Sequence, residues 1–185
     1  MPNHVTNILT VIGDRDRRME LFEAIKREDI GIGSIDFAKI IPVPSNIYQG
    51  DLELRYREKY GKNNWLDWNT ANWGSKWNSY GYDEMTKENF DGTNITFLTA
   101  WSNVSKVIEK LAEMYPDLEF TYQWADEHLG HNVGMLEYQN GKVIGCFIPS
   151  NGSEEAMEMA AQIHQIDLED EEYDTHDDIA EMEHT

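Results

Sequence analysis

Apolar and polar residues alternate along two segments of the chain, which indicates two β-strands with one buried face each. The alternating residues are Ile95, Phe97, Thr99 and Trp101 in the first segment and Leu118, Phe120, Tyr122 and Trp124 in the second. Between the two segments an apolar stripe at helical spacing predicts an amphipathic helix. The stripe consists of Val104, Val107, Ile108, Leu111 and Tyr115. With Ser102 or Asn103 as its cap and Pro116 at its end, this helix completes a strand-helix-strand unit over residues 95–124.

The N-terminal part of the chain shows a similar order of elements. Val5 to Ile12 is rich in β-branched residues and predicts a strand. Asp14 or Asp16 then caps a predicted helix, whose apolar face consists of Leu21, Phe22 and Ile25. The segment from Ser34 to Ile41 predicts a second strand, which Pro42 and Pro44 end. Residues 5–41 therefore form a first predicted strand-helix-strand unit.

Two such units in succession indicate an α+β protein with the split β-α-β sandwich of the ferredoxin-like fold. Three additions are expected. Residues 45–92 form a tryptophan-rich insertion with a short helical stretch over 52–60. Asn140-Gly141 predicts a tight hairpin between strands at 133–138 and 142–148, because both residues tolerate positive φ. A last helix begins after Ser153.

Charge divides the chain into two parts. The formal net charge is −20, and residues 167–185 contain ten acidic residues and no Lys or Arg, so removing them leaves −10 on residues 1–166. We expect one domain over 1–166 and an acidic tail over 167–185 that is disordered, or has a brief helix near Asp177 to Met182, because the tail has few apolar groups to bury. The negative charge argues against direct binding to nucleic acid or to an anionic membrane. It favours a protein partner with a basic surface, or simple solubility.

The chain contains no apolar stretch of the roughly 18–20 residues that a membrane span needs. Its start, Met1-Pro2-Asn3-His4, also lacks the basic segment of a signal peptide, and these two features favour the cytoplasm. The one cysteine, Cys146, forms no internal disulfide and is expected to be buried in a strand. The sequence leaves the oligomeric state open.

The tryptophan-rich insertion contains the candidate binding residues. They are Asn72, Trp73, Lys76 and Trp77, together with Trp101 beyond the insertion. Indole faces beside a cation and an amide suit stacking on a base, a sugar or a side chain of a partner. The alternative is that Trp65, Trp68, Trp73 and Trp77 form a small core under the insertion.

The sequence predicts no catalytic residue, metal site or cofactor. Phosphate-loop, nucleophile-elbow and zinc-protease motifs are absent. Asp126, Glu127, His128 and His131 form a cluster of oxygen and imidazole groups, but the spacing lacks the further ligand that would indicate zinc. We therefore expect a solvated loop there, and a structural role for His4.

Four segments together resemble the YubB-like family. They are Pro2-Asn3-His4-Val5-Thr6-Asn7, Phe37 to Pro44, Asn72-Trp73-Gly74-Ser75-Lys76-Trp77-Asn78, and Thr99-Ala100-Trp101-Ser102. The resemblance covers roughly residues 1–148 and implies a ferredoxin-like domain of phages, plasmids and other mobile elements, with no established activity. Asn103-Val104 departs from the family pattern, which often has prolines at this position, and the acidic tail is not part of the pattern.

These observations favour a non-enzymatic accessory protein of a mobile element that binds another protein. A further hypothesis is that its acidic surface mimics duplex DNA, which carries about one charge per 1.7 Å of axis, and so inhibits a host defence or DNA-binding system. The alternative is a small-molecule or nucleotide-binding protein, or a hydrolase, that uses the tryptophan-rich insertion as a pocket.

Overall fold

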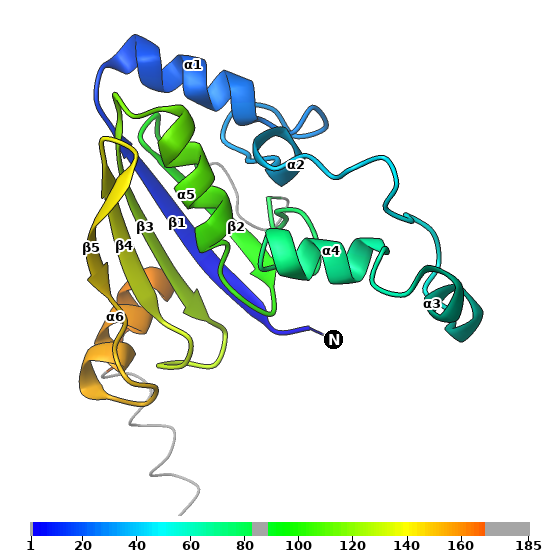
Figure 1. Ribbon diagram of the computed structural model, residues 1–185. Helices are drawn as coiled ribbons and strands as arrows, with labels where there is room; N and C mark the ends of the chain where they lie inside the picture. The colour runs from blue at the N-terminus through cyan, green and yellow to red at the C-terminus, as the bar shows by residue number, and fades with distance from the viewer. Residues whose placement is uncertain (1, 83–88, 169–185) are drawn as a thin grey trace, which may run out of the picture.

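The computed structural model describes residues 2–82 and 89–168, and the strands in this part of the chain form one five-stranded antiparallel sheet (Figure 1). In sequence order the strands are β1 (His4–Ile12), β2 (Asn94–Ala100), β3 (Glu119–Asp126), β4 (Gly134–Gln139) and β5 (Lys142–Phe147). Across the sheet their order is β2-β1-β3-β4-β5. The helices are α1 (Arg15–Ile25), α2 (Phe37–Ile40), α3 (Leu54–Tyr60), α4 (Trp65–Asn72), α5 (Ser105–Met114) and α6 (Glu154–His164).

The sheet contains the split β-α-β unit predicted for residues 95–124. Both β2 and β3 pair with β1 in antiparallel orientation, so they run parallel to each other with β1 between them. Helix α5 connects them and buries its predicted stripe, including Val107, Ile108 and Leu111, against the sheet. The predicted α+β, ferredoxin-like fold is confirmed.

The strand predicted over residues 34–41 is wrong. Its central residues form the short helix α2, because the Asp36 carboxylate accepts a hydrogen bond from the backbone N–H of Ala38 and caps that turn. Phe37 and Ile40 then lie one turn apart and are both buried in the main core. Residues 5–41 therefore contribute one strand to the sheet, and β1 finds its partners in β2 and β3.

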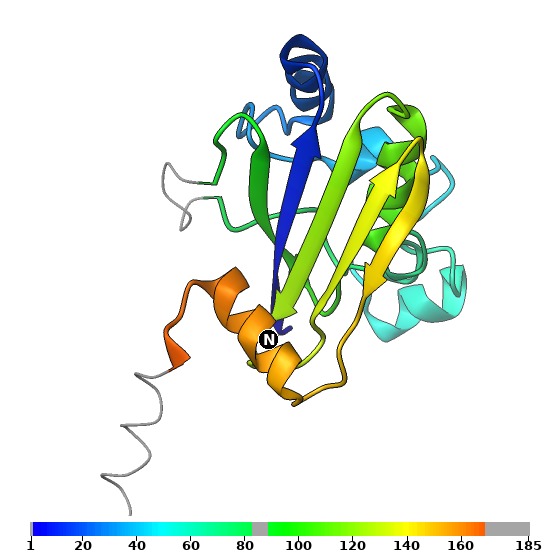
Figure 2. The same ribbon diagram turned by 90° about the vertical axis from the view of Figure 1, so that its left-hand side faces the viewer.

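The two faces of the sheet are covered unequally. The main core lies on the face covered by α5 and includes side chains of α1 and α2. On the opposite face α6 crosses the sheet (Figure 2), and a smaller apolar cluster lies beneath it, consisting of Ala125, Val133, Met159, Ala160 and Ile163. Ser153 caps α6 as predicted, by accepting a hydrogen bond from the N–H of Ala156.

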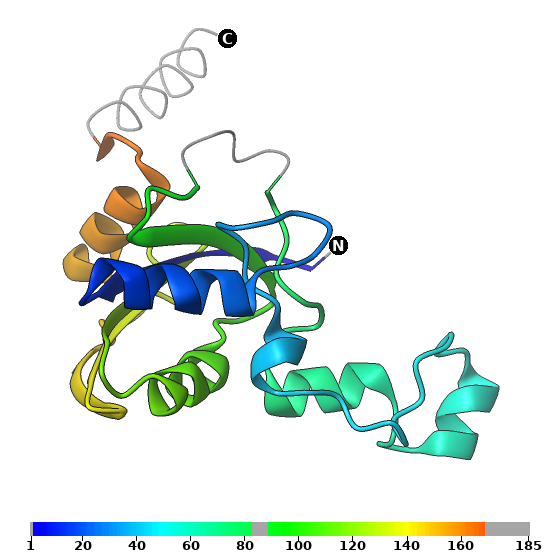
Figure 3. The ribbon, with the colours of Figure 1, turned by 90° about the horizontal axis from the view of Figure 1, so that it is seen from above.

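The predicted hairpin and the short helix in the insertion are also confirmed. Asn140 and Gly141 have φ values of 53° and 71°, and they connect β4 to β5. Helix α3 covers most of the predicted 52–60 stretch, and Figure 3 shows it at the end of an arm that extends away from the sheet. The tryptophan-rich run itself begins with α4, which the irregular apolar pattern did not reveal. Of the predicted tail, all but Asp167 and Leu168 lies outside the described residues.

A buried polar network connects the central strands to the start of α5. The Asn7 side chain is fully buried, and its Nδ2 donates to Thr99 Oγ1 over 2.9 Å and to the carbonyl of Val5 over 2.8 Å. The Tyr122 hydroxyl donates to Asn7 Oδ1 over 2.6 Å and accepts from the N–H of Val104 over 2.8 Å. Because buried polar groups are costly without partners, this network fixes β1, β2, β3 and the α5 N-terminus relative to one another.

Replacing Tyr122 by Phe should lower the free energy of unfolding by about 1–3 kcal/mol, because Asn7 Oδ1 and the Val104 N–H each lose a partner in the core. Urea denaturation measures the change. Tyr115→Phe is the matched control, since that ring is only half buried, and it should change stability by less than about 0.5 kcal/mol. Equal effects of the two substitutions would contradict the role assigned to the network.

Candidate functional site

Lys76, Trp77 and Trp101 meet at the surface, next to the end of β2. The Lys76 Nζ lies 4.6 Å from the Trp77 ring centroid and 5.2 Å from that of Trp101, so one ammonium group contacts both indoles. The two tryptophans are 39% and 40% exposed, which is unusual for such large apolar side chains. We call these three residues the indole–lysine site.

Hydrogen bonds between residues 75–80 and β2 hold this loop in place. The hydroxyl oxygen of buried Ser75 accepts from the N–H of Ala100 over 3.1 Å. Tyr80 and Leu98 exchange backbone hydrogen bonds of 3.1 and 2.8 Å. At the start of the loop Gly74 has φ of 87°, and a Cβ there would lie 2.7 Å from the carbonyl oxygen of Asn103, so only glycine fits.

Trp101 has a left-handed backbone conformation, with φ of 78°. It was predicted to continue the buried alternation of β2, and this prediction is wrong, because the strand ends at Ala100 and the ring turns outward. Its N–H donates to the carbonyl of Asn3 over 3.0 Å. The following residue is held by the Thr99 hydroxyl, which donates to the Ser102 carbonyl over 2.7 Å. Such a conformation is costly for a non-glycine residue and persists only where the surrounding structure holds it.

Tyr80 and His4 lie beside the indole–lysine site. The Tyr80 hydroxyl is 2.7 Å from His4 Nδ1 and 3.2 Å from the Thr99 carbonyl oxygen, to which it donates. The Tyr80 ring packs edge-on against Trp77, with 6.0 Å between the ring centroids. Burial, and secondarily the carboxylate of Glu127, raises the pKa of Tyr80 to about 12. The phenol is therefore neutral at physiological pH and acts as a hydrogen-bonding support for the site.

Two of the predicted binding residues lie elsewhere. Trp73 is only 5% exposed, its Nε1 donates to the carbonyl of Ile41 over 3.0 Å, and its ring packs on Phe37 and Trp68. Asn72 is in α4, where its side-chain amide donates to the carbonyl of Trp68 over 2.8 Å. The tryptophan-rich run is thus divided, since Trp73 belongs to the main core and Trp77 to the surface.

The sequence pattern did not reveal the contacts that dock the loop on the segment before α2. Asn78 Oδ1 accepts from the N–H of Phe37, and its Nδ2 donates to Asp36 Oδ1 over 2.7 Å. The Tyr82 hydroxyl donates to Ser79 Oγ over 2.8 Å and accepts from the N–H of Ile35 over 3.0 Å. The bonds to Ile35, Asp36 and Phe37 join residues 41–47 positions apart, so local periodicity carries no signal for these contacts.

Other candidate residues have structural partners. The Asp126 carboxylate is buried and accepts hydrogen bonds from Asn3 Nδ2 and the N–H of His128. Within residues 2–82 and 89–168, no group of three or more His, Cys, Asp or Glu side chains is arranged to hold a metal ion. Cys146 was expected to be buried, but it is exposed, because β5 is the edge strand of the sheet.

Comparison with known proteins supports the fold and gives no activity. Residues 76–167 match the family model described as the ferredoxin-like domain in Api92-like protein. The match begins at Lys76 and covers Trp77, Trp101 and the elements from β2 to α6, so this part of the chain is similar to an uncharacterised ferredoxin-like family. No curated protein and no solved structure matches this chain. Among the described helices, none has the length and apolar character to cross a membrane.

Substitutions at position 101 test whether the positive φ of Trp101 is strained. Trp101→Gly should be more stable than Trp101→Ala by about 1 kcal/mol, because both remove the ring but only glycine adopts positive φ without steric cost. Urea denaturation of the two variants gives the difference. If the alanine variant is the more stable one, the left-handed conformation does not persist in solution.

The raised pKa of Tyr82 predicts that the protein loses stability in alkali. Burial raises the pKa of Tyr82 to about 12, above its ordinary value of 10.0. The folded state therefore holds this proton more tightly, and the resulting stability is complete below pH 10 and is lost as the pH rises toward 12. The free energy of unfolding of Tyr82→Phe, measured by urea at several pH values, should fall less steeply in this range than that of the wild type. Parallel slopes would contradict the assignment.

Proposed function

We propose that this protein is a non-enzymatic accessory protein of a mobile genetic element and acts by binding another protein. The observation that carries the proposal is the indole–lysine site, in which two exposed indoles are held on a fixed backbone. Tryptophan is enriched among the residues that dominate binding energy at protein interfaces. Exposed aromatic rings that lie together also mark interaction sites, because their burial by a partner is favourable.

The mobile-element setting rests on the resemblance to the YubB-like family. Hydrogen bonds connect the segments that carry this resemblance to one another. The N–H of Trp101 donates to the carbonyl of Asn3. The N–H of Ala100 donates to Ser75 Oγ, and that of Phe37 donates to Asn78 Oδ1. Segments distant in the sequence thus build one local structure, and this supports treating them as a single family signature.

The charge supports a partner with a basic surface. A net charge of −20 attracts a positive protein over long range and raises its association rate, while the indoles provide contact energy. A protein that normally binds duplex DNA has such a surface. We therefore propose inhibition of a host defence or DNA-binding protein by competition with DNA.

The proposal is tested with the full-length protein as bait in a host extract. The captured partner should be released by added duplex DNA and by raised salt, and Trp77→Ala with Trp101→Ala should lower its affinity about tenfold or more. Trp65→Ala is the matched control, since this residue begins α4, outside the indole–lysine site, and its Nε1 donates to the carbonyl of Gly50. A partner that DNA does not displace would contradict the DNA-mimic part of the proposal. If the double variant binds as well as the control, the indole–lysine site is not the contact.

The second candidate is a small-molecule or nucleotide-binding protein, which the cation between two exposed indoles favours. Because Trp73 is in the core, the five-residue pocket expected from the sequence reduces to Lys76, Trp77 and Trp101. Thermal stabilisation by a nucleotide panel, lost in the Trp77→Ala and Trp101→Ala double variant and retained after removal of residues 167–185, would favour this candidate. Binding of a protein that weakens on the same truncation would favour the first.

A further inference from the structure

Strand β5 is a free edge of the sheet and is unusually apolar. Within the described part of the chain it pairs with β4 alone, so its outer backbone groups face away from the sheet. Four large apolar residues on and just after it are 45–63% exposed, and they are Val143, Ile144, Phe147 and Ile148. Proteins usually protect sheet edges with charged residues or proline, because an open edge pairs readily with another strand. Here Lys142 is the one charged residue of the strand.

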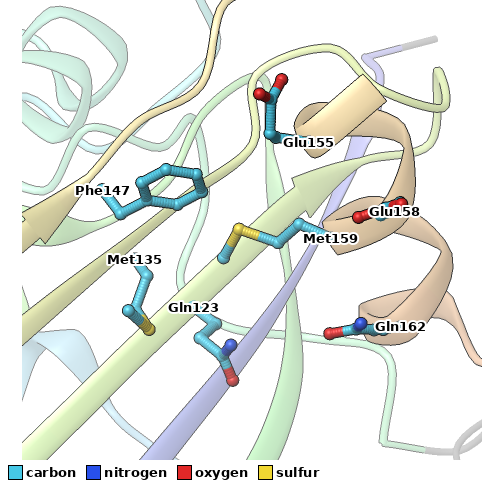
Figure 4. A pocket seen from close by; sticks show the side chains of 7 residues that line it. All are labelled: Gln123, Met135, Phe147, Glu155, Glu158, Met159 and Gln162. Atoms are coloured by element: carbon cyan, nitrogen blue, oxygen red, sulfur yellow. The ribbon is translucent and has the colours of Figure 1, made fainter. Parts of the chain in front are cut away.

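A groove lies between the β5 side of the sheet and α6 (Figure 4). Its volume is about 310 Å³, and its lining residues are Gln123, Met135, Phe147, Glu155, Glu158, Met159 and Gln162. Phe147 of β5 is paired with Met135 of β4, which is paired with Gln123 of β3, so one row of side chains crosses three strands and forms the sheet side of the groove. The groove therefore begins at the open edge.

The chemistry of the groove suits an apolar stem that carries a positive charge. Met135, Met159 and Phe147 supply apolar surface, and methionine adapts to differently shaped groups. Glu155 and Glu158 line the α6 side of the groove, and neither takes part in an ion pair with another residue of 2–82 or 89–168. The backbone N–H of Glu155 and the Ser153 side chain lower the pKa of Glu155, so its carboxylate is ionised at neutral pH.

We propose that β5 binds an extended segment of a partner protein as a sixth strand, with Lys or Arg side chains of that segment placed in the groove. Main-chain hydrogen bonds would provide affinity, and alternate side chains would provide specificity, as in other cases of strand addition. The methylene stem of a Lys or Arg would lie on Phe147 and Met135, with its charged group at Glu155 or Glu158. This surface lies at the opposite edge of the sheet from β2, and so is separate from the indole–lysine site.

The charge selects a basic partner over a second copy of this chain. If two β5 strands paired about a two-fold axis, they would form one continuous sheet, and both α6 helices would lie on the same face of it. Each molecule carries a net charge of −20, so the two copies would repel each other as they approached. A basic strand replaces this repulsion by attraction.

The test uses the full-length protein and a fluorescent peptide of about eight residues that alternates Val with Lys. Fluorescence anisotropy should show saturable binding that weakens as salt is raised. The same peptide with Glu in place of Lys should not bind. A Val–Lys peptide with methylated backbone nitrogens at alternate positions should not bind either, because it cannot donate hydrogen bonds to the edge. Binding of the methylated peptide equal to that of the parent would overturn strand addition.

Variants locate the contact on the protein. Glu155→Gln with Glu158→Gln should weaken binding of the Val–Lys peptide about tenfold and reduce its salt dependence. Glu154→Gln is the matched control, because it removes a carboxylate from the same helical turn but does not line the groove. Ile144→Lys should also weaken binding about tenfold or more, since it places a positive charge on the edge against a basic strand.

Besides equal binding of the methylated peptide, two further results would overturn the proposal. One is binding of the Val–Lys peptide that neither Ile144→Lys nor the double glutamine variant changes, because the contact would then lie elsewhere on the acidic surface. The other is a dimer in sedimentation analysis that Ile144→Lys dissociates, because the occupant of the edge would then be a second copy. Far-UV circular dichroism of each variant, unchanged from the wild type, shows that a loss of binding is not a loss of fold.

Discussion

The buried side-chain amide of Asn7 is the interaction on which the arrangement of the central strands depends. It lies in the middle of β1, where an apolar residue would be the ordinary choice, and contacts groups from β1, β2 and β3. A buried amide is costly unless its donors and acceptor are paired, so only one relative placement of these strands satisfies it. The apolar residues around it provide most of the burial energy, while Asn7 and Tyr122 select the arrangement in which that burial occurs.

The same network accounts for the strained surface at Trp101. Tyr122 and Thr99 lie in the core, and their hydroxyls bind the turn that follows Trp101. The Tyr122 hydroxyl accepts from the N–H of Val104, and the Thr99 hydroxyl donates to the carbonyl of Ser102. The turn from β2 to α5 is therefore anchored from below, and Trp101 is held at positive φ between fixed neighbours. The cost of that conformation is offset by core interactions several residues away. A rigid exposed indole results, which loses little conformational entropy when a partner covers it.

The sequence predicted those parts of the fold that depend on local pattern. The alternation in β3, the stripe of α5 and the Asn140-Gly141 turn each satisfy a rule that involves near neighbours only. Prediction from the sequence failed where contacts between distant residues decide the local structure. Residues 34–41 have the composition of a strand, but Asp36 caps a helix there and Asn78 binds its first turn. In the same way, Trp73 and Trp77 are four residues apart in one motif, and only tertiary packing places the first in the core and the second at the surface.

The high net charge of this chain opposes pairing between the apolar edge strands of two copies. Most sheet edges are protected locally, by a lysine pointing inward or by a bulge that twists the strand. Here β5 has a bulge opposite Glu137 and Tyr138, but its unpaired residue, Ile144, is 63% exposed. Two molecules of charge −20 repel each other before two such edges come into contact. A neutral chain is repelled only weakly, and a basic chain is attracted. Protection by overall charge would therefore discriminate among partners in a way that a local lysine on the edge does not, because it disfavours identical copies and leaves the edge open to the basic strand that we propose.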